Sequence, residues 1–258
     1  DARPDGYLPK ELGTASVIAA RMLAAPITDG TDDDDVIVAD VGGPYHIFGR
    51  GGDDTITGSD GGDVIDGGAG RDVMAGGRGN DVYYVDNPGD VIIETDRGGF
   101  DKVISSIDYS LGAFLEHVTL TGSAISATGN ALRNTLEGNA LNNILSGGDG
   151  NDTFAGNGGD DILIGGNGSD GYVYELGDGR DTIIETGTGP DDRDVIVLAG
   201  AMTPEDVTFI RNPDVLDDLI LQFPDGGSIT IKDYFATTGP NIEGVEFASG
   251  TVWSRVDL

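Results

Sequence analysis

The stretch from Gly49 to Asp86 reads GRGGDDTITGSDGGDVIDGGAGRDVMAGGRGNDVYYVD and opens with four consecutive nine-residue repeats. These repeats are GRGGDDTIT, GSDGGDVID, GGAGRDVMA and GGRGNDVYY. Position six of each repeat is an aspartate: Asp54, Asp63, Asp72 and Asp81. Position eight is large and apolar: Ile56, Ile65, Met74 and Tyr83. A fixed period with fixed chemistry predicts stacked structural units and argues against a flexible linker.

A second array runs from Gly129 to Val173 as GNALRNTLE, GNALNNILS, GGDGNDTFA, GNGGDDILI and GGNGSDGYV. Its position-six residues are Asn134, Asn143, Asp152, Asp161 and Asp170. A degenerate repeat before the first array places Asp35 at position six, and the next one has Tyr45 there. Irregular segments keep an aspartate before an apolar run, at Asp90, Asp101, Asp181 and Asp194. Counting back in nines from Leu136 reaches Ala127 and Val118, so we expect one continuous solenoid.

The residue types of the repeat predict its geometry. Positions seven to nine form a short strand in which only position eight points toward the core, because side chains alternate between the two faces. Positions one to six form a turn, whose glycines tolerate left-handed backbone conformations. Two repeats complete one coil, so each repeat stacks on the second repeat after it, with strands about 4.8 Å apart.

This stacking places position-six carboxylates beside one another: Asp54 with Asp72, Asp63 with Asp81, and Asp152 with Asp170. Without a cation each pair repels by about 1 kcal/mol in water and by about 3–4 kcal/mol at an effective dielectric constant of 20. Carboxylates and turn carbonyls are hard oxygen ligands that suit Ca²⁺ better than Mg²⁺, which demands a tighter octahedron. Asn134 and Asn143 are neutral, so their turns are expected to pack through amide hydrogen bonds instead of metal.

Composition excludes several classes of protein. The formal net charge is −32, with 46 acidic against 14 basic residues, which argues against binding to nucleic acid or to anionic lipid. Disorder is a poor fit, because 38% of residues are hydrophobic and they recur at regular positions. There is no cysteine, so no disulfide partner or thiolate metal site exists. The absence of an initiator Met and of a cleavable leader leads us to expect a piece of a longer protein.

Other readings of the repeats and of the histidines are weaker. A GxGxxG motif begins at Gly67 and at Gly76, but a nucleotide loop requires a single copy between a strand and a helix, and nine-residue spacing leaves no room for a helix. Aspartates on a solvated face would not keep phase with an apolar position. The two histidines, His46 and His117, are far apart in sequence, and no serine lies in a nucleophile-elbow pattern. We therefore expect no catalysis within this chain, although the parent protein can still be an enzyme or a toxin.

The two ends of the chain lack the repeat. Residues 1–29 have helix-like composition and are expected to form a short helix, either a cap over the first coil or a linker from an upstream domain. Residues 30–199 are assigned to the roll, with arrays at 30–95 and 129–187 joined by an irregular solenoid stretch. Residues 200–258 alternate like antiparallel strands and are rich in aromatic residues, so we interpret them as a cover for the open end of the solenoid.

The nonapeptides match the pattern G-G-x-G-x-D-x-U-x, in which U is a large apolar residue. The chain thereby resembles the hemolysin-type calcium-binding (RTX) modules of proteins exported by bacterial type I secretion. The segments YVYELGDGRDTIIE and SITIKDYF are similar to the region that follows RTX blocks in adenylate cyclase toxins and related proteins. The resemblance implies an all-β, right-handed parallel β-roll that binds several Ca²⁺ ions between turns. It also implies disorder in the low-calcium cytosol, folding outside the cell, and contact with the type I secretion apparatus.

The resemblance also implies a set of calcium ligands, namely the position-six aspartates and the carbonyls of the turns. Transferred to this chain, the candidate metal ligands are Asp35, Gly52, Asp54, Gly61, Asp63, Gly68, Gly70, Asp72, Gly77, Gly79, Asp81, Asp90, Asp101, Gly148, Gly150, Asp152, Asn157, Gly159, Asp161, Gly166, Gly168, Asp170 and Asp181. An adhesin or polysaccharide-recognition module is the alternative function, with a host or matrix glycan as partner. Its candidate contacts would be Tyr45, Tyr83, Tyr84, Tyr172 and Tyr174, for which packing in the core or at an edge is the preferred interpretation.

Overall fold

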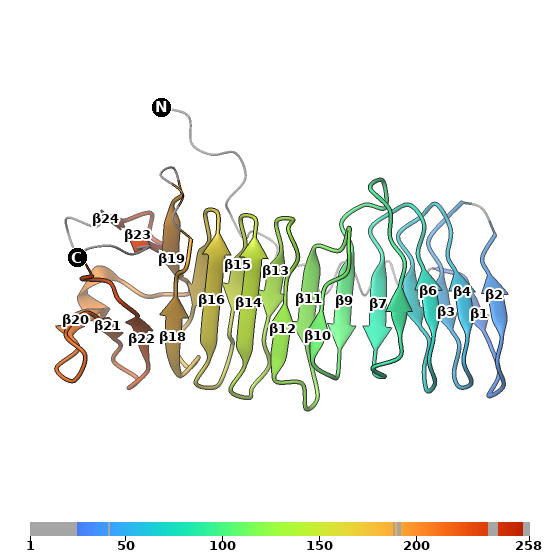
Figure 1. The fold of residues 1–258 in the computed structure, drawn as a ribbon, viewed down its shortest axis with the longest axis horizontal. Helices are drawn as coiled ribbons and strands as arrows, with labels where there is room; N and C mark the ends of the chain where they lie inside the picture. The colour runs from blue at the N-terminus through green and yellow to red at the C-terminus, as the bar shows by residue number, and fades with distance from the viewer. Residues whose placement is uncertain (1–24, 41, 188, 190–191, 237–241, 255–258) are drawn as a thin grey trace.

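The computed structural model describes residues 25–40, 42–187, 189, 192–236 and 242–254. The N-terminal helix expected within residues 1–29 lies almost wholly outside the described residues. The described part is built of β-strands and one 3-10 turn, η1 (Pro204–Asp206). No helix in that part is long and apolar enough to cross a membrane. Figure 1 shows an elongated stack of coils that runs from β1 at one end to the antiparallel strands at the other.

One long sheet runs along the whole stack. It has twelve strands, and all neighbours up to β23 pair in parallel. In spatial order they are β1 (Ile27–Asp29), β3 (His46–Phe48), β5 (Val64–Asp66), β7 (Val82–Val85), β9 (Lys102–Ser105), β11 (His117–Leu120), β13 (Thr135–Glu137), β15 (Thr153–Ala155), β17 (Gly171–Tyr174), β19 (Asp194–Leu198), β23 (Ile242–Phe247) and β24 (Val252–Ser254).

The opposite side of the roll is divided into two sheets. The first contains β2 (Val36–Val38), β4 (Thr55–Thr57), β6 (Val73–Ala75) and β8 (Val91–Ile92). The second contains β10 (Tyr109–Ser110), β12 (Ser126–Thr128), β14 (Ile144–Asp149), β16 (Ile162–Asn167), β18 (Arg180–Ile184), β22 (Ser228–Ile231), β21 (Leu219–Gln222) and β20 (Thr208–Arg211). The interruption lies between β8 and β10, directly after the first array.

The strand register confirms the expected stacking of each repeat on the second repeat after it. Ile56 pairs with Met74, and Leu136 pairs with Phe154, both eighteen residues apart. Position-eight side chains form the core, and Met74, Leu136 and Phe154 are each 0% exposed. The Phe154 ring stacks on the Tyr172 ring with centroids 5.1 Å apart and planes 10° apart. The predicted all-β parallel β-roll is therefore confirmed.

The C-terminal part joins the roll before it turns antiparallel. β22 pairs in parallel with β18, and β23 pairs in parallel with β19, so parallel stacking continues beyond residue 199. Antiparallel pairing then links β20 to β21, β21 to β22, and β23 to β24, as the alternating sequence predicted. Aromatic contacts fill this end, with Tyr174 stacked on Phe223 at 4.5 Å and Phe247 against Trp253 at 4.7 Å.

Candidate metal centre

Position-six side chains form two hydrogen-bonded ladders along the first array. In one ladder the backbone N–H of Asp54 donates to Oδ1 of Asp72 at 2.8 Å, and the N–H of Asp72 donates to Oδ1 of Asp90 at 3.1 Å. In the other, the N–H of Asp63 donates to Oδ1 of Asp81 at 2.6 Å, and the N–H of Asp81 donates to Oδ1 of Asp101 at 2.8 Å. The carboxylates that were expected to stack therefore do lie on adjacent turns.

The second array repeats this arrangement. The N–H of Asp152 donates to Oδ1 of Asp170, and that of Asp170 donates to Oδ1 of Asp194, both at 2.8 Å. On the other side of the roll the N–H of Asp161 donates to Oδ1 of Asp181 at 3.1 Å. Each ladder thus uses one oxygen of each carboxylate to bind the backbone of the preceding coil.

The second oxygen of most ladder carboxylates has no partner among the described residues. Both the residue and the atom are buried in every case, with the residues at most 1% exposed. The unpartnered Oδ2 atoms belong to Asp54, Asp72, Asp81, Asp101, Asp152, Asp161 and Asp170. A buried charged oxygen without a hydrogen bond is strongly unfavourable, so these atoms mark places where a cation or a proton is needed.

Burial raises the pKa of these carboxyl groups, and neighbouring carboxylates raise it further. The pKa of Asp81 rises to about 8, mainly through desolvation and then through the charges of Asp101 and Asp63. The same causes, with other neighbours, raise the pKa of Asp181 to about 8 and that of Asp152 to about 7. Carboxyl groups shifted this far are poised to exchange a proton for another positive charge near neutral pH.

The turns are of two kinds, which differ in the backbone conformation of the residue at position two of the repeat. In what we call open turns, this residue has a positive φ and the position-six Oδ2 is unpartnered. The open-turn pairs are Arg50 with Asp54, Gly68 with Asp72, Gly77 with Asp81, Gly148 with Asp152, Asn157 with Asp161, and Gly166 with Asp170.

In closed turns the position-two N–H instead donates to the side chain at position six of the same repeat. Ser59 donates to Oδ2 of Asp63 at 2.6 Å, and Thr31 donates to Oδ2 of Asp35 at the same distance. The two asparagine repeats are closed as well, since Asn130 donates to Oδ1 of Asn134 and Asn139 donates to Oδ1 of Asn143, both at 2.7 Å. A closed turn satisfies its position-six oxygen without any ion.

The asparagine turns contain the amide hydrogen bonds that were expected of them. Nδ2 of Asn134 donates to the carbonyl oxygen of Leu115 at 3.1 Å, and Nδ2 of Asn143 donates to that of Ala124 at 3.3 Å. Both asparagine side chains are buried. A carboxylate at either position could not make these donations, which explains why neutral residues occupy the closed turns of the second array.

Carbonyl oxygens of the neighbouring coil occupy the space that a Cβ would need at several turn glycines. A Cβ added at Gly70 would clash with the carbonyl oxygen of Gly52, and one added at Gly168 would clash with that of Gly150. Among the candidate turn residues, Gly52, Gly68, Gly70, Gly77, Gly79, Gly148, Gly150, Asn157, Gly159, Gly166 and Gly168 have a positive φ, whereas Gly61 does not. Open turns therefore combine crowded carbonyls with an unpaired carboxylate oxygen.

This donor set fits calcium. The donors available in an open turn are carboxylate and carbonyl oxygens, which are the ligands of Ca²⁺. Asp35 and Asp90 are half-buried, and Oδ2 of each accepts a backbone N–H from its own turn. Both belong to a ladder, but neither has the unpartnered oxygen that defines an open turn. Asp181 is 3% exposed and ends its ladder on β18.

Five acidic residues that are not in the candidate ligand set lie in or beside the ladders. Asp194 continues the ladder after Asp170, and it is 5% exposed. Two of the ladders then end on glutamates, because the N–H of Asp101 donates to Oε2 of Glu116 at 2.9 Å and that of Asp194 donates to Oε2 of Glu243 at 2.8 Å.

The other two acidic residues are Glu94 and Glu185, and each lies beside a ladder. The tetrapeptide IIET occurs at residues 92–95 and 183–186, and this internal repeat was the available signal for both.

The histidines and tyrosines lie on the strands of the roll. His46 is in β3, and His117 is in β11, where its Nε2 lies 3.1 Å from a carboxylate oxygen of Glu137. Tyr83, Tyr172 and Tyr174 are at most 1% exposed, while Tyr84 is 38% exposed. Three of the five tyrosines considered for glycan contact are therefore core residues.

Comparison with known proteins gives two family matches. The RTX calcium-binding nonapeptide repeat (4 copies) matches residues 48–83 and 128–172, and the haemolysin-type calcium binding protein related domain matches residues 218–257. No curated protein matches the chain. Among solved structures, the extracellular lipase LipA from Serratia marcescens matches with 22% identity and a TM-score of 0.25, over 81% of this chain and 38% of the lipase chain. The chain thus spans well under half the length of that lipase.

The first family match falls on the repeats whose turns carry the ladders, and the second falls on the strands that end the roll. The open turns of these repeats contain carboxylate and carbonyl oxygens, which are ligands suited to calcium. The chain is therefore a parallel β-roll that contains two segments matching RTX calcium-binding nonapeptide repeats and a C-terminal segment matching the haemolysin-type calcium binding protein related domain.

Proposed function

We propose that this chain is a calcium-dependent folding module of a secreted bacterial protein and has no catalytic role of its own. One observation carries the proposal: six open turns each bury a carboxylate oxygen that has no partner among the described residues. These oxygens are spread over both arrays, so they affect the whole roll. Whether these oxygens gain a positively charged partner is therefore expected to decide whether the roll forms.

Without a counter-ion the open-turn carboxylates oppose folding. In the unfolded chain they are hydrated, whereas in the roll they are desolvated and lie next to carboxylates of adjacent turns. The net charge of −32 adds repulsion over the whole chain. We therefore expect the unfolded state to be favoured when calcium is scarce and the pH is neutral.

The open turns hold the donors for the ion. The ligands would be Oδ2 of the open-turn aspartates, with carbonyl oxygens such as those of Gly52 and Gly150 from the same turns. Bound calcium would supply positive charge and accept six to eight oxygen ligands. Because the turns exist only when the coils are stacked, the free energy of binding adds to the free energy of folding.

This behaviour suits export. A chain that stays unfolded at low cytosolic calcium can pass through a type I secretion apparatus and fold in a calcium-rich exterior. The RTX repeats support this role. A glycan-recognition role has less support, because Tyr83, Tyr172 and Tyr174 are buried and not available to a ligand.

The test is a calcium titration of the chain at neutral pH, followed by far-ultraviolet circular dichroism. The expected result is a cooperative gain of β-structure with Ca²⁺, and little gain with Mg²⁺ at equal concentration and ionic strength. A chelator should reverse the transition. A chain that is already fully β-structured in chelator, with a spectrum that calcium leaves unchanged, would contradict the proposal.

A further inference from the structure

Each array ends with a glutamate in place of a turn glycine. The register that pairs Met74 with Ile92 stacks Glu94 on Gly76, which is position one of its repeat. The register that pairs Ile164 with Ile184 likewise stacks Glu185 on Gly165. Position one is glycine in every regular repeat of both arrays. A long acidic side chain therefore enters the roll at the same structural position twice.

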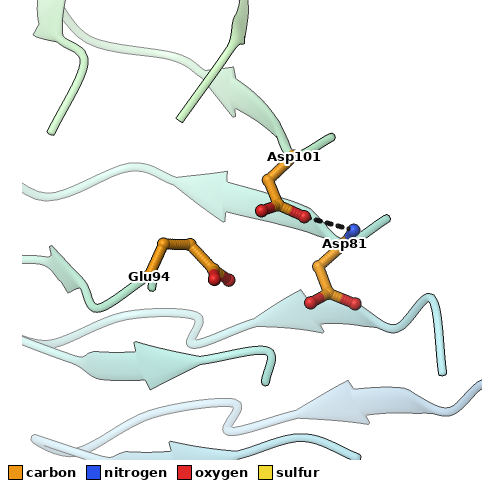
Figure 2. Close-up of side chains that lie close together, drawn as sticks. All are labelled: Asp81, Glu94 and Asp101. Atoms are coloured by element: carbon orange, nitrogen blue, oxygen red, sulfur yellow. Dashed lines mark hydrogen bonds between the residues drawn. The ribbon is translucent and has the colours of Figure 1, made fainter. Parts of the chain in front are cut away.

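Both glutamates approach two ladder aspartates. Ligand oxygens of Asp81, Glu94 and Asp101 all lie within 4.8 Å of one another, and the three carboxylates face one another in Figure 2. The second array repeats the cluster with Asp170, Glu185 and Asp194, also within 4.8 Å. Asp81, Asp101 and Asp170 directly precede strands of the twelve-stranded sheet, and Asp194 is the first residue of β19. Each glutamate follows a strand of the opposite side.

Both clusters contain buried oxygens that have no partner in the described residues. Asp81 is 1% exposed and Asp101 is 0% exposed, and Oδ2 of each is unpartnered. In the second cluster the unpartnered atoms are Oδ2 of Asp170 and Oε2 of Glu185. Three carboxylates within this distance require compensation, because like charges in a desolvated space repel strongly.

A tyrosine orients each glutamate. The hydroxyl of Tyr83 donates to Oε1 of Glu94, and the hydroxyl of Tyr172 donates to Oε1 of Glu185. Tyr83 is itself held by the N–H of Gly76, which donates to its hydroxyl at 2.6 Å. Within the two arrays only these two position-eight residues are tyrosines, and each occurs in the last repeat of its array. The tyrosine does not occupy the second oxygen of either glutamate: Oε2 of Glu94 accepts the N–H of Thr95 at 3.2 Å, and Oε2 of Glu185 has no partner in the described residues.

We propose that each array ends in a further calcium site made of three carboxylates: Asp81, Glu94 and Asp101 in the first, and Asp170, Glu185 and Asp194 in the second. Asp81 and Asp170 are also the position-six aspartates of the last open turn in each array, and these two turns differ from the other open turns because a glutamate from the opposite side of the roll joins them. Carboxylate oxygens around a small buried volume select a hard divalent cation.

The position of these sites suggests what they do. Directly after Glu94 the opposite sheet is interrupted between β8 and β10, and Glu185 lies beyond the last nonapeptide, which ends at Val173. An ion bound by carboxylates from both sides of the roll would tie the last regular coil to the irregular segment that follows it. The inference rests on the proposed calcium binding, but it adds two glutamates that the repeat pattern does not include.

The experiment counts calcium ions bound to the full chain by native mass spectrometry and isothermal titration calorimetry. Glu94→Gln and Glu185→Gln keep the shape of the side chain and can still accept the tyrosine hydroxyl. Each is expected to lose one ion, and the double variant two. Glu175→Gln removes one exposed carboxylate outside the clusters and should keep the full count. An unchanged count and unchanged affinities in the double variant would overturn the proposal.

Thermal unfolding with and without calcium separates a site from a structural role. If the glutamates bind an ion, the double variant should melt at a lower temperature than the parent in calcium. It should melt at the same or a higher temperature in calcium-stripped buffer of about pH 4, where protonation of the carboxylates is expected to let the roll form without the ion. Equal losses under both conditions would show a structural role only and would overturn the proposal. A parent chain that binds no calcium would instead refute the proposed function, so the two failures are distinguishable.

Discussion

The backbone N–H of Ser59 donates to Oδ2 of Asp63 at 2.6 Å, and no such bond reaches Oδ2 of Asp72 one repeat further along the chain. Both aspartates occupy position six, and both are 0% exposed. The difference comes from position two, where Gly68 has a φ of +82° and Ser59 does not have a positive φ. A single residue thus decides whether a buried carboxylate is satisfied by the protein or requires a cation.

Asp72→Asn is expected to weaken calcium-induced folding much more than Asp63→Asn. Asp72 has an unpartnered oxygen, so its neutral variant loses a ligand, whereas Asp63 already accepts hydrogen bonds from Ser59 and Tyr45. The midpoint of a calcium titration should move to clearly higher calcium for Asp72→Asn and stay near the parent value for Asp63→Asn. Equal shifts in the two variants would contradict the distinction between open and closed turns.

The calcium-free chain is expected to gain β-structure as the pH falls. A carboxyl group with a higher pKa in the folded than in the unfolded state binds more protons when folded, so protonation favours the roll. In the roll the pKa is about 6 for Asp72 and about 8 for Asp81, mainly because of desolvation. An unfolded aspartate titrates near pH ~3.9.

The stabilisation by protons should therefore be complete below about pH 4 and should be lost as the pH rises through about 6 to about 8. Circular dichroism in calcium-stripped buffers measures it, with light scattering to exclude aggregation near the isoelectric point of about 4.1. A chain that stays unstructured from pH 8 to pH 4 would show that carboxylate charge is not what opposes folding.

Gly168→Ala is expected to destabilise the calcium-loaded roll well beyond the conformational penalty of a positive φ. Gly168 has a φ of +121°, and an added Cβ would clash with the carbonyl oxygen of Gly150. Gly226→Ala is the control, since Gly226 has a φ of +93° and open space around the Cβ position. We expect a loss of about 1–2 kcal/mol in the control and a larger loss for Gly168→Ala in chemical unfolding. Similar losses would mean that the turns are not packed as described.

Leu136→Ala is expected to reduce the free energy of unfolding by about 2–5 kcal/mol, because Leu136 is 0% exposed at position eight. Leu132→Ala in the same repeat should change it by less than about 0.5 kcal/mol, since Leu132 is 38% exposed at position four. Urea unfolding in saturating calcium measures both. A reversed order of the two variants would contradict the assignment of position eight to the core.

The nonapeptide period is enough to predict the core, the register and the ladders. A repeat of nine residues with two strands per coil requires pairing at a separation of eighteen, and Ile56 with Met74 shows it. The same phase predicts that Asp72 lies beside Asp54, and the hydrogen bond between the two residues confirms it. These features follow from residue types that recur at fixed positions of the repeat, so they can be predicted from one sequence.

Other features depend on segments that break the period. Glu94 and Glu185 follow irregular spacers, so counting in nines could not align them with turn glycines. The pairing of Arg180 with Ser228 joins segments 48 residues apart, which no local pattern encodes. The difference between Ser59 and Gly68 at position two becomes meaningful only when the hydrogen bond to position six is seen.

The most direct test of the central claim is the size of the chain in solution with and without calcium. In chelator at neutral pH, small-angle scattering should give a radius of gyration approaching the ~56 Å expected of an unfolded chain of this length. Excess calcium should reduce it to the value calculated from the elongated roll, in a single transition. A chelator-treated chain that keeps the dimensions of the roll would contradict the claim that its buried carboxylates need calcium to fold.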